Sequence, residues 1–217
     1  MSTEPKVYQH PRLILCEGPE DVCFFRALIE DRNIQHCHLD HTGLSRNDRG
    51  GNSKFGSKLR ALKFNRTFRV IERILLVADS DDDPVAAFAN VRAQVEAAGL
   101  PAPAAVGVST ESNPSIRIIT MPHSAAGHLE TCLIDAASAT NPTITAFAQN
   151  FVDNVTTSAE WTGPRRDKLM LRSLVSAGWP RDPGINLAPL FQDIQARRRI
   201  PLNHQSFNPL AAILSDF

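Results

Sequence analysis

The predicted fold depends on two stretches of sequence, Leu13-Ile-Leu-Cys-Glu-Gly-Pro-Glu-Asp21 and Leu75-Leu-Val-Ala-Asp-Ser-Asp81. Each begins as a short apolar run, typical of a strand buried on both faces, and stops at acidic residues. Pro19 and Pro84 then favour the start of a helix. Because strand and helix follow one another twice, we predict a parallel sheet with helices on its faces.

Working outward from these stretches, the pattern predicts an α/β, Rossmann-like, mostly parallel sheet flanked by helices, with a C-terminal helical extension. We expect an α/β core over residues 1–140 and a helical extension over residues 141–217 that packs on the core. Further strands are predicted at residues 34–40, 104–108 and 117–121. Further helices are predicted at residues 57–71, 86–98, 129–137, 143–155, 165–177 and 188–196.

Composition excludes several classes of protein. The 217 residues carry 23 basic and 23 acidic side chains, so no overall positive field marks the chain as a nucleic-acid binder. No apolar run approaches the roughly 18 residues that cross a bilayer, and the N-terminus lacks a secretory pattern. The four cysteines form no CxxC pair, which favours reduced thiols and a cytoplasmic location.

The acidic residues at the ends of the predicted strands form the main candidate site. Glu17 and Asp79 follow apolar strands, and functional groups of parallel sheets collect beyond the carboxyl ends of the strands. Taken singly, a Glu-Gly pair can be a simple turn, and an Asp cluster can be a solvated helix N-terminus. Together they favour a site for a hard cation, Mg²⁺ or Mn²⁺, as one or two ions, since clustered carboxylates repel without one.

Both stretches resemble the motifs of Toprim domains, an apolar strand with Glu-Gly and a second strand with Asp-x-Asp. The segment with Pro122 and Gly127-His-Leu-Glu130 is similar to a signature of nucleases of the overcoming-lysogenization-defect (OLD) family. The resemblance implies a Toprim fold over residues 10–140, phosphodiester chemistry, and a role for Lys168 in catalysis. It implies the catalytic residues Glu17, Asp79, Asp81 and Lys168, and the metal ligands Glu17, Asp21, Asp79, Asp81, Asp83 and Glu130, with the register of the Asp79 to Asp83 run left open.

Basic residues near these motifs are candidates for contacts with nucleic acid, although a charge run can also be a solvated helix face. The chain lacks a G-x-x-x-x-G-K-[ST] loop, so an ATPase or another defence-system protein would be a separate partner. No membrane partner is expected, and the oligomeric state stays open. The candidate nucleic-acid contacts are Arg46, Arg49, Lys54, Lys58, Arg165 and Arg166.

Three functions are compatible with these features. The first is a Mg²⁺-dependent DNA or RNA nuclease, in phage defence or nucleic-acid processing. The second is a non-catalytic Toprim module that binds nucleic acid or a protein, and the third is nucleotidyl transfer as in primases. A zinc site at His36, His38 and His41 is disfavoured because no companion Cys/His pair has the usual spacing, while His123 and His128 are expected to bond around the acidic site.

Overall fold

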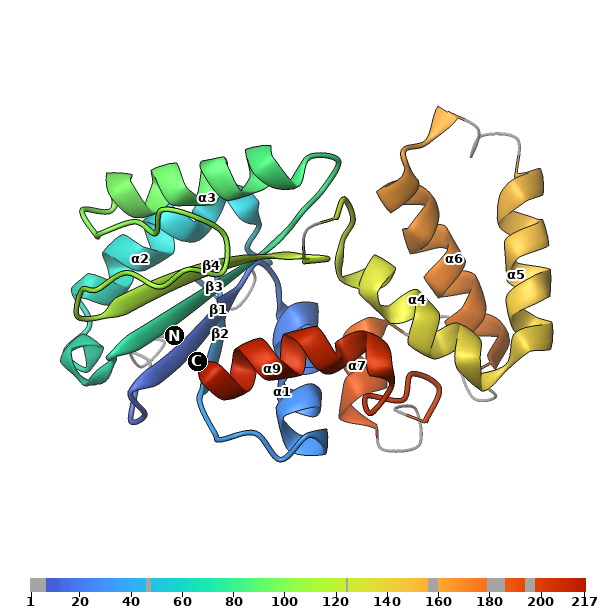
Figure 1. Cartoon of the computed structure of the whole chain (residues 1–217), viewed down its shortest axis with the longest axis horizontal. Coiled ribbons are helices and arrows are strands. Elements are labelled where there is room, and N and C mark those ends of the chain that lie inside the picture. Colours follow the sequence, from blue (N-terminus) through green and yellow to red (C-terminus); the bar gives the residue numbers. More distant parts are fainter. Residues whose placement is uncertain (1–6, 46–47, 124, 156–159, 179–185, 194–197) are drawn as a thin grey trace.

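Four parallel strands form the central sheet, in the order β2-β1-β3-β4 (Figure 1). This computed structural model describes residues 7–45, 48–123, 125–155, 160–178, 186–193 and 198–217. The strands are β1 (Arg12–Cys16), β2 (His38–His41), β3 (Arg73–Asp79) and β4 (Ser115–Met121). The predicted α/β, Rossmann-like fold with a parallel sheet flanked by helices is therefore confirmed.

Helices connect the strands and cover both faces of the sheet. Helix α1 (Pro19–Asp31) joins β1 to β2, α2 (Phe55–Lys63) lies between β2 and β3, and α3 (Pro84–Ala97) joins β3 to β4. Two 3₁₀ turns flank α2: η1 (Asn52–Lys54) precedes it and η2 (Phe68–Val70) follows it. The remaining elements are α4 (Leu129–Thr140), α5 (Pro142–Asn154), α6 (Gly163–Gly178), α7 (Leu187–Gln192), η4 (Gln205–Phe207) and α9 (Asn208–Asp216).

The apolar runs of the strands are buried on both sides, as their composition predicts. Alternate side chains of β1, Ile14 and Cys16, pack with α1, α4 and the C-terminal helices. The intervening Leu13 and Leu15 pack with α2 and α3 on the other face. A parallel strand with two apolar faces can be buried only if helices cover both, which explains the three-layer arrangement.

The order of strands reverses between β1 and β3. From β1 the chain passes through α1 to β2 on one side, whereas from β3 it passes through α3 to β4 on the other. At such a switch point the connections leave in opposite directions and open a crevice beyond the carboxyl ends of the strands. Figure 1 shows the strands running toward α4 and α6, which stand beyond this edge.

Local sequence accounts for the helix starts that flank this crevice. Pro19 and Pro84 occupy first-turn positions of α1 and α3, where the missing N–H costs nothing. Asp83 caps α3, because its Oδ1 accepts hydrogen bonds from Val85 N at 2.9 Å and Ala86 N at 3.1 Å. Both strand-turn-helix units predicted from the sequence are therefore present.

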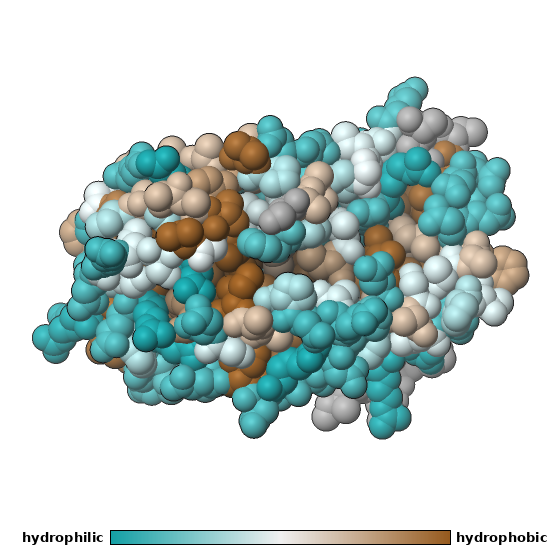
Figure 2. All heavy atoms as spheres, in the orientation of Figure 1, coloured by the Kyte–Doolittle hydropathy of each residue, from teal (hydrophilic) through white to brown (hydrophobic). Residues whose placement is uncertain are grey.

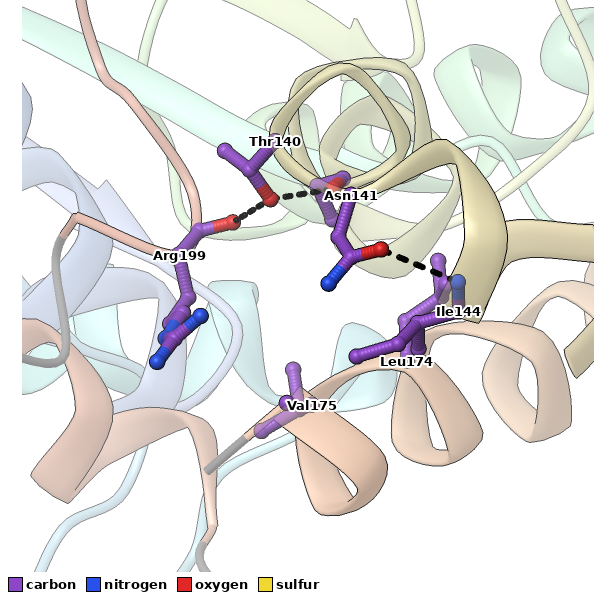
Figure 3. Close-up of a pocket in the computed structure, with 8 residues that line it drawn as sticks. Thr140, Asn141, Ile144, Leu174, Val175 and Arg199 are labelled. Carbon is purple, nitrogen blue, oxygen red and sulfur yellow. Dashed lines mark hydrogen bonds between the residues drawn. The ribbon is translucent and has the colours of Figure 1, made fainter. Parts of the chain in front are cut away.

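The C-terminal part packs back on the core through α1 and α4. Arg32 Nε donates to Leu202 O at 2.9 Å, and Thr140 Oγ1 donates to Arg199 O at 3.3 Å. Figure 3 shows this second contact beside Asn141, whose Oδ1 accepts from Ile144 N at 3.1 Å and caps α5. The space between these residues is a cavity of about 10 Å³, enough for roughly one water molecule.

The structure corrects some of the predicted elements. Residues 104–108 form a turn with Gly107 at φ +74°, and not the predicted strand, since only an isolated bridge pairs Ser109 with Arg117. The second strand is shorter than predicted, and the C-terminal helix α9 was not predicted at all. No helix among the described residues is long and apolar enough to cross a membrane.

Candidate functional site

The carboxyl edge of the sheet brings the two acidic motifs together. Glu17 directly follows β1, and Asp79 is the last residue of the neighbouring β3. Glu17 Oε1 accepts a hydrogen bond from Asp79 N at 2.9 Å. Two segments 62 positions apart in the chain are therefore in direct contact, which the sequence hypothesis required.

A loop of residues 49–51, here called the glycine loop, fixes the backbone of Glu17. Thr42 Oγ1 and Gly51 N donate to Glu17 O at 2.8 and 3.1 Å. Gly50 has φ +84°, and a Cβ at this position would lie 2.1 Å from Glu17 O. Glycine is needed here because the loop must approach the strand end closely in a left-handed conformation.

Helix α4 supplies the third side of the site. Its first residue, Leu129, donates its N–H to Asp79 Oδ1 at 3.1 Å, so the helix N-terminus faces that carboxylate. The next residue, Glu130, is a buried acid with 8% of its surface exposed. The segment before the helix is held by Gly127 N, which donates to Asp81 O at 2.8 Å.

Asp21 completes the acidic group from the first turn of α1. Its Oδ2 accepts a hydrogen bond from Gly18 N at 2.9 Å, which holds the side chain against the turn after β1. The carboxylates of Glu17, Asp21, Asp79 and Glu130 therefore come from three separate connections at one edge of the sheet.

These four acids line an open cavity of about 600 Å³. Three basic residues share it: Lys168 and Arg172 from α6, and Arg49 from the glycine loop. Arg49 and Arg172 are exposed, whereas Glu130 is buried and the other acids are partly buried. The cavity thus has an acidic floor and a basic rim.

Burial and mutual repulsion make the acidic floor costly to ionise. Burial, together with the nearby charges of Asp21 and Asp81, raises the pKa of Glu17 to about 7, against the hydrogen bond from Asp79 N and the charge of Lys168. Burial, with Glu130 and Glu20, raises the pKa of Asp21 to about 6. Burial, with Asp21, Glu17 and Glu130, raises the pKa of Asp79 to about 9. Lys168 opposes each shift, so its charge acts on the whole group.

A divalent cation fits the chemistry of this donor set. Carboxylate oxygens are the ligands that Mg²⁺ prefers, and this ion commonly uses one or two of them, with waters and substrate phosphates completing the shell. Among the residues that the structure describes, no group of three or more His, Cys, Asp or Glu side chains is already arranged to hold a metal. The fit is therefore to an ion held by few protein ligands, and not to a closed protein cage.

A family model matches residues 11–216, which include every acidic residue of the cavity. The chain belongs to the DUF3226 family. The description of that family is "Protein of unknown function". No curated protein and no solved structure matches the chain. An activity must therefore be argued from the site itself.

The structure brings some of the predicted acidic residues into the cavity and leaves others beside it. Glu17, Asp21, Asp79 and Glu130 line it, whereas Asp81 and Asp83 do not. Asp81 has φ +48°, and its Oδ1 lies 3.0 Å from His128 Nε2, so the carboxylate pairs with an imidazole. Asp83 is engaged as the cap of α3. The sequence left open which aspartates of the Asp79 to Asp83 run face the site. In the structure Asp79 is the one that faces the cavity.

The predicted basic residues separate in the same way. Arg49 and Lys168 line the cavity. Lys54 pairs with Asp48, and Lys58 Nζ lies 3.0 Å from Asp40 Oδ2 in a largely buried ion pair.

Arg165 and Arg166, the two predicted arginines at the start of α6, lie elsewhere. Arg165 stacks 4.6 Å from the Trp161 ring, and Arg166 Nη2 lies 2.7 Å from Asp153 Oδ1. Arg46 lies outside the described residues.

His36 and His38 lie at the amino end of β2, away from the acidic cavity, whereas His41 ends that strand beside Cys16. The rings of His36 and His38 each lie 5.1 Å from that of His10, edge to face. Over the part of the chain that is described, they belong to no group of three or more side chains placed for a metal. The zinc alternative gains no support from the arrangement.

Several residues of the cavity were not predicted as site residues. Glu20 lies in the first motif itself, and Arg172 follows Lys168 by four positions, one helical turn later on the same face of α6. That spacing was a signal for Arg172. Asn186 and the first turn of α7 also line the cavity, and no local pattern pointed to them.

Proposed function

We propose that this chain is a Mg²⁺-dependent phosphodiester-cleaving protein of the Toprim kind, a nuclease acting on DNA or RNA. The observation that carries the proposal is the cavity in which Glu17, Asp21, Asp79 and Glu130 lie beneath Lys168 and two arginines. Metal-dependent phosphodiester hydrolysis needs ligands for a cation and positive groups for the charge of the phosphate. Candidate residues for both line one cavity at the switch point of the sheet, which supports the proposal.

Each residue has a role that its position supports. Glu17 and Asp79, in contact at the strand ends, would hold the ion, and Asp21 and Glu130 would add negative charge around it, with waters and phosphate oxygens completing its shell. When bound, Mg²⁺ would neutralise these acids and stabilise negative charge on the phosphate.

The basic residues would act on the substrate. The ammonium of Lys168 would stabilise charge that develops on phosphate oxygens, and the exposed Arg49 and Arg172 would bind flanking phosphates. The proposed partner is therefore nucleic acid, in a defence or processing complex.

The direct test is cleavage of labelled single- and double-stranded DNA and RNA with Mg²⁺, Mn²⁺ or EDTA. The protein should nick or degrade at least one substrate with metal, and Glu17→Gln should lower the rate by about a hundredfold or more. Glu72→Gln, which removes an exposed acid outside the cavity, is the matched control. Full cleavage by the Glu17 variant would refute the proposal, and a strict need for nucleoside triphosphates would indicate nucleotidyl transfer.

One observation favours a second function, a non-catalytic module that binds nucleic acid or a protein. Many tight metal sites need three or more ligand side chains already in place. The described residues contain no such group. Calorimetric titration with Mg²⁺, run beside the cleavage assay, separates the two functions. Binding of the ion and of nucleic acid without turnover would identify the module.

A further inference from the structure

A second cavity, of about 380 Å³, lies beside α4 and is distinct from the acidic cavity. Glu130 of α4 faces the acidic cavity, whereas Cys132, two residues later, lines the second one. Residues two positions apart point to roughly opposite sides of a helix. The two cavities therefore lie on different faces of α4, and the second is not part of the proposed phosphodiesterase site.

Three segments that are distant in sequence enclose this cavity. The end of β4 with the following Pro122 forms one wall, α4 forms another, and the C-terminal η4 and α9 form the third. Figure 2 shows hydrophobic surface in a hollow near the middle of the face of the molecule that is in view. The apolar lining residues are Ile119, Met121, Pro122, Ala125, Phe207, Pro209, Leu210 and Ile213. A volume above about 300 Å³ with a mostly apolar lining is typical of small-molecule sites.

A few polar groups interrupt the apolar lining. Asp135 is exposed and, among the described residues that line the cavity, is the only Asp, Glu, Lys or Arg. Cys132 lies one turn before it on α4. His123 adds an imidazole. The carboxylate of Asp135 thus carries the fixed charge of this cavity.

We propose that this cavity binds a small amphipathic amine, with its apolar body between α4 and α9 and its cationic group beside Asp135. The apolar walls supply affinity, and charge complementarity with a single carboxylate selects the amine. At about 4 Å in water, one such pair favours the cation by roughly fivefold over a neutral group. An anionic ligand of the same shape is disfavoured by a similar factor.

Three probes of one shape and different charge test the proposal: 2-phenylethylamine, 2-phenylethanol and 3-phenylpropanoate. Their binding to the full chain is measured by protein-observed NMR and calorimetry. The amine should bind about fivefold more tightly than the alcohol, and the acid most weakly. Equal binding of all three, or tightest binding of the acid, would overturn the charge assignment.

The cysteines give a second readout that locates the binding. Cys132 lines the cavity, whereas Cys23 on α1 does not, and both are partly exposed. N-ethylmaleimide labelling, followed by mass spectrometry of peptides, should show that the amine slows labelling of Cys132 and leaves Cys23 unchanged. Equal protection of both cysteines, or of neither, would place the amine elsewhere.

Two variants separate charge from shape. Asp135→Asn should abolish the fivefold preference for the amine while the alcohol still binds, and Asp31→Asn, an exposed acid on α1 outside the cavity, is its control. Leu210→Trp should fill the cavity and remove binding of all three probes. Retained preference in the Asp135 variant would refute the proposal even if the Leu210 variant failed to fold. None of these results depends on nuclease activity.

Discussion

At the amino edge of the sheet, arginines bind the C-terminal helix, whereas at the carboxyl edge acidic side chains gather around one cavity. Arg12 Nη2 donates to Leu214 O at 2.6 Å, and Arg73 Nη1 donates to Phe217 O at 3.0 Å. Arg117 Nη2 lies 2.9 Å from Asp216 Oδ2. At the opposite edge, burial and like charges raise the pKa values of Glu17 and Asp79 to about 7 and 9.

The difference shows which charges serve the fold and which serve the site. The chain supplies its own acceptors for the arginines, so their removal should weaken folding. For the acids, the described residues supply backbone N–H donors and the basic side chains of the cavity, which do not offset burial and repulsion. Neutralising an acid should therefore stabilise the metal-free protein.

The largest effect on stability is expected for Arg12→Ala. This buried side chain donates to the main chain of α9 and lies over the Phe217 ring, so its loss leaves acceptors unpaired and a gap beside the helix. The free energy of unfolding should fall by about 3 kcal/mol in urea denaturation. Arg92→Ala, which removes half of an exposed ion pair with Glu96, should change it by about 0.5 kcal/mol or less. Equal losses in the two variants would contradict the contrast.

The next effect is on the pH dependence of stability without metal. The folded-state pKa values of Glu17, Asp21 and Asp79 lie above their ordinary values, so the unfolded chain releases these protons first as the pH rises. Their contribution to stability is complete below about pH 4 and is lost by about pH 9. In EDTA, the free energy of unfolding should therefore fall by about 2 kcal/mol or more from pH 6 to pH 9.

Saturating Mg²⁺ should reduce this fall, because the ion binds the ionised carboxylates of the folded protein. The measurement is urea denaturation at several pH values with EDTA or Mg²⁺. Identical pH profiles with and without the ion would argue against a cation site at this edge.

A smaller effect is expected for Gly50→Ala. The new Cβ would meet Glu17 O and would force a left-handed backbone on alanine, so the unfolding free energy should fall by about 1.5 kcal/mol. Displacement of the loop should also weaken Mg²⁺ binding, measured by calorimetry. Gly163→Ala has no neighbour within 4 Å of the added Cβ and serves as the control. Unchanged Mg²⁺ binding in the Gly50 variant would show that the loop does not position Glu17.

The smallest effect has the opposite sign. Glu17→Gln keeps the oxygen that accepts from Asp79 N but removes a charge that is costly above pH 7. At pH 8 in EDTA, the variant should be more stable by about 1 kcal/mol, although its cleavage activity is expected to be lost. Thermal denaturation in EDTA measures this gain. A loss of stability would place Glu17 with the structural charges, as at the amino edge.

Much of the fold could be predicted because β1 and β3 are apolar runs with helix-starting prolines directly after them. The wrong strand at residues 104–108 had a similar composition, but Gly107 turns the chain there and local composition cannot reveal whether a partner strand exists. Helix α9 was missed because a helix of 9 residues is marginal by itself. Its contacts with Arg12 and Arg117 stabilise it, and they come from strands far away in the chain.

The sequence by itself determined which acids could form a site, since strand ends at a switch point share one edge of a parallel sheet. Only the tertiary structure decided that Glu130 and Lys168 join them, that Asp83 caps α3, and that Lys58 is engaged with Asp40. The physical reason is the distance along the chain over which each interaction acts. Strand ends and helix starts follow from neighbours along the chain, whereas charges find partners across space, where packing of distant elements fixes them.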